Sequence, residues 1–119
     1  MKTTLLKSFV VMMVLLSVTA IGSAQNKKIE REQIKVSGVC NLCQERIENA
    51  ALIKGVKFVS WDKEKQILEV VYKSDKTTLL TIEKAIAEVG HDTENVRATD
   101  EVYNNLYHCC QYREGQEVH

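Results

Sequence analysis

Two pairs of cysteines in this sequence have types and spacing that could do chemistry. Cys40 and Cys43 form a Cys-x-x-Cys motif, and Cys109 and Cys110 are adjacent near the other end of the chain. Such a motif can hold a metal ion, exchange electrons, or form a short structural disulfide, and four cysteines allow several pairings. Thiolate sulfur is a soft ligand that suits thiophilic ions such as Cu(I) and Zn(II). The elements that position the thiols must decide among these uses.

The Cys-x-x-Cys motif lies between a segment typical of a strand and one typical of a helix. Ile34 and Val36 alternate with polar residues before Gly38, and apolar residues recur at helical spacing over residues 41–54. The unpaired N–H groups and the positive dipole end of a helix N-terminus favour a thiolate over a thiol. Two cysteines on the loop and the first helical turn would converge on one ion. The setting therefore agrees with metal binding.

The rest of the chain predicts a small α+β fold. A hairpin of two strands and a second apolar-striped helix follow the first helix, which gives the order β-α-β-β-α-β. Two helices covering one face of a small antiparallel sheet form a ferredoxin-like sandwich, here followed by a short C-terminal helix. The expected elements are strand 28–37, helix 41–54, strands 56–61 and 66–72, a helix from Thr77 or Thr78 to Gly90, strand 93–98 and a helix from Thr99 or Asp100 to Arg113.

The first 24 residues have the pattern of a signal peptide. Lys2 and Lys7 precede the apolar run 9–16, and small residues end at Ala24. We therefore expect an exported protein, periplasmic in a Gram-negative bacterium and otherwise secreted or held by an uncleaved signal. Export would place the cysteines where disulfides can form. After cleavage we expect no stable membrane insertion.

Composition argues against several classes of function. Acidic and basic residues balance at 16 each, and removal of the leader lysines would leave a small negative net charge. Since no basic tract is present, we expect no nucleic acid partner. Neither a Ser/His/Asp constellation nor a phosphate-binding glycine loop occurs, so we expect no enzymatic activity.

The segment Ser37-Gly38-Val39-Cys40-Asn41-Leu42-Cys43 resembles the Gly-Met-x-Cys-x-x-Cys motif of the heavy-metal-associated domain. This family includes copper chaperones, metal-binding modules of copper-pumping ATPases and periplasmic mercury-binding proteins. The helices "QERIENAALIKGV" and "AIAEVGHD" are also similar to the family pattern. The likeness runs from about Ile29 to Ala98, so we expect a domain over residues 28–98 and a separate tail over residues 99–119.

The resemblance implies a ferredoxin-like fold and a soft metal bound by Cys40 and Cys43. Cu(I) is the first expectation, with Zn(II) and Hg(II) as alternatives, and a metal-transporting membrane protein is the expected partner. Two departures from the family pattern matter. Gly38 stands where the family has a Met that packs beneath the loop, which predicts a looser loop. His91 lies on the loop beside the metal loop in such folds, so it is either a third ligand or a solvent-exposed histidine.

The second cysteine pair raises the question of a closed site. Adjacent cysteines bridge each other only with strain. In a four-stranded sheet the last strand runs away from the metal loop, so the tail would have to return along the open sheet face. Such a return would bring Cys109 or Cys110 to Cys40 and Cys43 and add one or two thiolates. The alternative is a flexible tail whose cysteines act separately.

Two other uses of the cysteines stay open. In a thiol–disulfide protein, Cys40 and Cys43 would accept electrons from Cys109 or Cys110. A thioredoxin-like fold keeps a cis-proline beside its active cysteines, whereas this chain contains no proline. In a structural interaction domain, the cysteines would simply be disulfide-bonded.

Overall fold

The computed structural model describes residues 28–119, so the predicted signal peptide lies outside the described residues. Within these residues no helix is both long enough and apolar enough to span a bilayer. The elements in chain order are β1 (Ile29–Lys35), α2 (Asn41–Ala51), β2 (Val56–Asp62), β3 (Ile67–Lys73), α3 (Leu79–Glu88), α4 (Asp100–Asn104) and two 3₁₀ helices, His108–Cys110 and Tyr112–Glu114.

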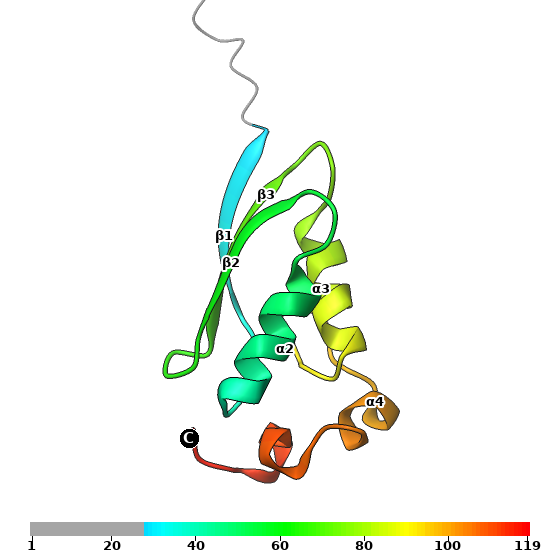
Figure 1. The fold of residues 1–119 in the computed structure, drawn as a ribbon. Coiled ribbons are helices and arrows are strands. Elements are labelled where there is room, and N and C mark those ends of the chain that lie inside the picture. The colour runs from blue at the N-terminus through cyan, green and yellow to red at the C-terminus, as the bar shows by residue number, and fades with distance from the viewer. Residues whose placement is uncertain (1–27) are drawn as a thin grey trace, which may run out of the picture.

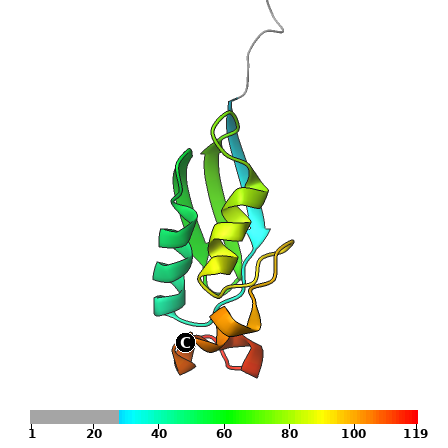
Figure 2. The same cartoon turned by 90° about the vertical axis from the view of Figure 1, so that its right-hand side faces the viewer.

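The three strands form one antiparallel sheet in the order β1-β3-β2. Every second residue of β3 is buried, namely Leu68, Val70 and Tyr72, so one face of the sheet belongs to the core. Helices α2 and α3 lie side by side on that face (Figures 1 and 2) and bury residues such as Ile47 and Ile86 against it. This architecture confirms the predicted ferredoxin-like α+β sandwich.

The predicted strand over residues 93–98 is wrong, because only a single bridge between Val36 and Thr93 forms there. The buried carboxylate of Glu83 accepts hydrogen bonds from the Thr93 hydroxyl at 2.7 Å and from the Asn95 N–H at 2.9 Å. The Asn95 N–H, which a strand would donate to a neighbouring strand, is thus bonded to the Glu83 side chain instead. The segment becomes a compact loop instead of a fourth strand.

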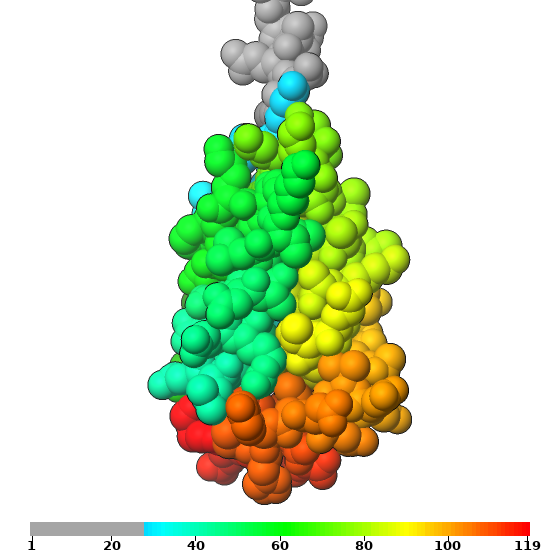
Figure 3. Space-filling view, turned by 45° about the vertical axis from the view of Figure 1, so that its right-hand side comes forward, coloured from blue at the N-terminus to red at the C-terminus, as the bar shows by residue number. Residues whose placement is uncertain are grey.

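The tail consequently takes a different path from the one expected. Without a fourth strand the chain does not leave the motif end of the sandwich, and the tail packs across the end where α3 finishes and α2 starts (Figures 1 and 3). None of residues 28–119 covers the other face of the sheet, where Phe58 is 47% exposed. The single predicted helix to Arg113 is also wrong, since the tail bends into three short helical segments.

Polar contacts hold this tail against the loop that follows α3. The Tyr112 hydroxyl donates to the Gly90 carbonyl at 2.7 Å and accepts from the Asp92 N–H at 2.8 Å. The Arg113 guanidinium pairs with the Asp92 carboxylate at 2.8 Å and lies 4.2 Å from the centre of the Tyr103 ring. The expectation of a flexible tail is therefore wrong, because the tail is an ordered part of the fold.

The expectation of a loose motif loop is also wrong. The Trp61 ring fills the space that a side chain at position 38 would occupy. A Cβ atom at Gly38 would lie 2.8 Å from Cη2 of Trp61 and 3.1 Å from Cβ of Cys43. The indole N–H of Trp61 donates to the Val36 carbonyl at 2.9 Å, and the Gly38 N–H donates to Oε1 of Gln66 at 2.8 Å. The loop is therefore held by Trp61 of β2 and by Gln66, which precedes β3.

We predict that Gly38→Met destabilises the fold by about 1–3 kcal/mol, because the added side chain and the indole compete for the same space. Urea unfolding followed by circular dichroism measures this change. In the double variant Gly38→Met/Trp61→Leu the smaller residue makes room, so the two changes should cost less together than the sum of each alone. Wild-type stability of Gly38→Met would contradict this account of the loop.

Candidate metal centre

The start of α2 places the two motif cysteines on the same side of the loop. Cys40 is the N-cap residue with an extended backbone, and Cys43 lies in the first turn. The N–H groups of a first turn have no partner within the helix, so they stabilise negative charge at this end of α2. Both cysteines are buried, at 5% and 0% exposure. The motif therefore presents its sulfurs inward, toward the tail.

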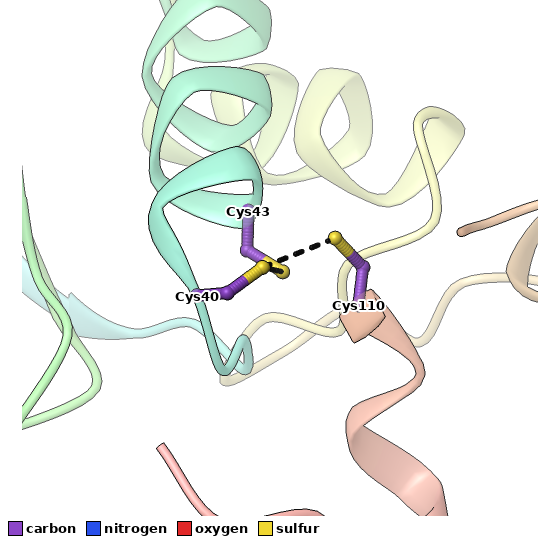
Figure 4. Close-up of side chains that lie close together, drawn as sticks. All are labelled: Cys40, Cys43 and Cys110. Atoms are coloured by element: carbon purple, nitrogen blue, oxygen red, sulfur yellow. Dashed lines mark hydrogen bonds between the residues drawn. The ribbon is translucent and has the colours of Figure 1, made fainter. Parts of the chain in front are cut away.

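A third thiol comes to the motif from the tail. The Sγ atom of Cys40 lies 3.3 Å from Sγ of Cys43 and 3.3 Å from Sγ of Cys110. Figure 4 shows the three side chains pointing toward one another. All three sulfurs lie within 4.8 Å of one another. Cys110 is fully buried, and all four cysteines are free thiols. Three of the four predicted cysteine ligands thus meet at one point.

Cys109 is placed differently from Cys110. Its Sγ atom lies 4.0 Å from Sγ of Cys110, but it is outside the group of three. Its side chain is half-buried, whereas the three clustered cysteines are buried. The short 3₁₀ helix His108–Cys110 turns the two adjacent side chains in different directions. The structure therefore shows a three-sulfur cluster with a fourth thiol beside it.

His91 is not the solvent-exposed residue of the alternative expectation, since its exposure is 0%. Its Nδ1 atom lies 2.8 Å from the Ser37 carbonyl, and its ring stacks on Tyr112 with centroids 5.5 Å apart. Nε2 has no hydrogen-bond partner among the described residues. His91 also lies outside the group formed by the three sulfurs. It connects the motif loop to the tail.

The three thiols differ in how readily they lose a proton. Burial raises the pKa of the Cys40 thiol, but the Cys43 N–H, the neighbouring thiols and the Leu42 N–H outweigh it and lower that pKa to about 7. Burial raises the pKa of the Cys43 thiol. Burial and the other two thiols raise the pKa of Cys110 to about 12, although the Arg46 guanidinium offsets part of that rise. Of the three clustered cysteines, Cys40 therefore loses its proton most readily.

Arg46 is a residue that the sequence analysis missed. It follows Cys43 by three positions on α2, so its side chain projects from the same region of the helix surface. Its guanidinium lies 5.6 Å from the centre of the Tyr107 ring, and Nη1 is buried without a partner among the described residues. A cation held beside the sulfurs stabilises thiolates relative to thiols. The sequence shows that Arg46 follows Cys43 by one helical turn, but it does not show that Arg46 contacts Tyr107 of the tail.

We predict that the buried His91 makes stability fall at acidic pH. Burial lowers its pKa to about 4, so between pH 6.5 and 4 the unfolded chain binds a proton that the folded chain does not. Stability must then be lost as the pH falls through this range, by about 3 kcal/mol at pH 4. Urea unfolding at several pH values measures this loss.

His91→Gln, which stays neutral, should show a shallower loss of stability than the wild type between pH 7 and 4. His108→Gln removes an exposed histidine of the tail and serves as the matched control, which should follow the wild type. Equal slopes for His91→Gln and the wild type would contradict the assignment.

Comparison with known proteins gives matches only at the level of structure. No family model and no curated protein matches this sequence. The CopZ metallochaperone superposes with a TM-score of 0.52 at 27% identity, over 54% of this chain and 98% of its own. Oxidized MerP from Ralstonia metallidurans CH34 gives 0.53 at 24% identity, over 56% and 94%.

A copper binding domain from HMA7, a P-type ATPase, gives a TM-score of 0.52 at 24% identity, over 54% of this chain and 89% of its own. At 24% identity, the matches to MerP and HMA7 support the fold alone. All three neighbours carry the sandwich described above. The predicted resemblance to heavy-metal-associated domains is therefore confirmed in the fold, with a cysteine cluster at the place where the motif predicted it.

Proposed function

We propose that this protein binds a thiophilic metal ion through Cys40, Cys43 and Cys110. The observation that carries the proposal is the convergence of three buried sulfurs within 4.8 Å at the start of α2. Three sulfurs about 2.3 Å from a central ion, in one plane with it, lie about 4 Å apart. The cluster needs to open by only a fraction of an ångström to reach this arrangement.

The number of sulfurs favours Cu(I), with Hg(II) as the alternative, over Zn(II). Soft thiolate ligands select Cu(I), whereas structural Zn(II) is almost always held by four ligands in a tetrahedron. Neither His91 nor Cys109 lies within the group of three sulfurs. A fourth protein ligand would require movement of one of these residues.

The fold neighbours support a role in carrying metal rather than in catalysis. The neighbour with 27% identity is described as a metallochaperone, and another neighbour is a copper binding domain of a P-type ATPase. By analogy we propose that this protein is exported, is not an enzyme, and holds or relays the ion for a metal-transporting membrane protein. The charge of the chain, near zero overall, does not identify that partner.

A thiol–disulfide function is the second candidate. Cys40 combines a pKa of about 7 with two thiols 3.3 Å away, which also suits disulfide exchange. The fold is not that of thioredoxin, and the described residues contain no cis peptide bond. A reduction potential for Cys40 and Cys43 in the range of catalytic oxidoreductases, together with no retained metal, would favour this second function.

We predict that Cys110→Ser changes the coordination number of bound Cu(I) from three sulfurs to two. X-ray absorption of the protein loaded under anaerobic conditions counts the sulfur neighbours directly. The affinity for Cu(I), measured by competition with a chromophoric chelator, should fall about 10- to 100-fold. Cys109→Ser is the matched control and should keep three sulfurs. If wild type and Cys110→Ser had the same sulfur count, the three-thiol site would be wrong.

We predict that Arg46→Met lowers the affinity for Cu(I) by about tenfold, because three thiolates around a single positive ion leave a net negative charge in a buried place. Competition with the same chelator measures the effect. Arg46→Lys keeps the charge and should retain more of the affinity than Arg46→Met. Equal affinity in Arg46→Met and the wild type would show that the guanidinium only packs on Tyr107.

A further inference from the structure

Burial of the cluster poses a problem of access. Cys40, Cys43 and Cys110 are at most 5% exposed, so none of the three sulfurs faces an ion carrier directly. The tail covers the motif from below, and its last residue is tied to the motif loop by the His119 N–H, which donates to the Val39 carbonyl at 2.8 Å. An exchange of ligands at the ion would need an incoming sulfur within bonding reach of it. A carrier cannot reach the cluster without either an opening of the tail or an intermediate thiol.

Cys109 has the position of such an intermediate. It is half-buried, so one side of its side chain meets solvent while the other packs against the core cluster. Its Sγ lies 4.0 Å from the buried Sγ of Cys110, about the spacing of two sulfurs bound to one ion. It comes from the same 3₁₀ helix as Cys110, so the two sulfurs keep this spacing without movement of another element. The four thiols thus form a path from solvent to the buried site.

We propose that Cys109 is the entry thiol of the site, which takes the ion from an external ligand and passes it to Cys110 and Cys40. This inference rests on the proposed metal binding. On entry, the Cys109 thiolate forms a bond to the ion, a ligand of the carrier leaves, and the Cys109 thiol proton goes to solvent. On transfer, the buried thiols form bonds to the ion and give up their protons, while the Cys109–ion bond breaks and the Cys109 thiolate takes up a proton again. The ion stays Cu(I) throughout, so no oxidant or reductant is needed. Cys109 is a ligand during transfer and not in the final complex.

Transfer through Cys109 predicts a separation of rate from affinity. Loss of the entry thiol should leave the final complex unchanged, since its three sulfurs remain. It should slow both loading and release, because the same intermediate is crossed in both directions. His108 is the natural control, as it is an exposed potential ligand at the adjacent position of the same 3₁₀ helix.

The experiment mixes the reduced, purified protein with a coloured Cu(I)–bicinchoninate complex in an anaerobic stopped-flow instrument. The decay of the chelate colour gives the loading rate, and its final level gives the stoichiometry and affinity. We expect Cys109→Ser to load at least about tenfold more slowly than wild type, with the same stoichiometry and affinity. His108→Ala should load at the wild-type rate.

The outcomes separate this inference from the proposed function. If wild-type protein takes no Cu(I) from the chelate, the proposed function itself fails. If wild type binds and Cys109→Ser loads at the same rate, the ion enters by opening of the tail and the entry role is overturned. If Cys109→Ser also loses affinity or a bound sulfur, Cys109 is a permanent ligand and the entry role is again overturned.

Discussion

The position of Cys110 depends on the ion pair and hydrogen bonds that hold the tail to the loop after α3. Arg113 and Tyr112 both bind Asp92, and Tyr112 also reaches the Gly90 carbonyl. The pair is shielded from solvent, with the side chains of Arg113 and Asp92 only 15% and 18% exposed. Such partly buried, geometrically constrained pairs contribute more than exposed ones. They fix the two residues that follow Cys110 closely in sequence, and through them the third sulfur.

The loop after α3, which holds the tail, forms a single β-bridge in place of a fourth strand. Glu83 and Thr93 bond groups that would otherwise have extended β pairing beyond the bridge at Val36. Since the chain is not carried away along a fourth strand, α4 begins near the end of the sandwich where α2 starts (Figure 1). His91 completes the connection by contacting the motif loop through Ser37 and the tail through Tyr112. One short loop therefore supports both halves of the cysteine cluster.

The cysteines of the cluster differ in the pKa of their thiols. The N-cap position and neighbouring donors give Cys40 the lowered pKa, whereas burial keeps Cys110 protonated at neutral pH. The guanidinium of Arg46 on α2 lies over the Tyr107 ring of the tail and is a positive charge that favours the thiolate of Cys110. Metal binding at such a site must release protons from the buried thiols.

The local sequence indicated the sandwich and the motif, because the apolar periodicity of each element and the spacing of the two cysteines are local signals. Strand alternation and helical stripes specify which faces are buried, and the three-residue spacing places Cys40 and Cys43 on one helical turn. Only the tertiary structure decided that Cys110, and not Cys109, joins Cys40 and Cys43. The position of Cys110 depends on contacts of the tail with Asp92, which is distant from the tail in sequence. Two further contacts could not be predicted from the sequence for the same reason, namely Trp61 against Gly38 and Arg46 against Tyr107. Each joins segments that are distant in the chain, and local patterns do not show which distant segments meet.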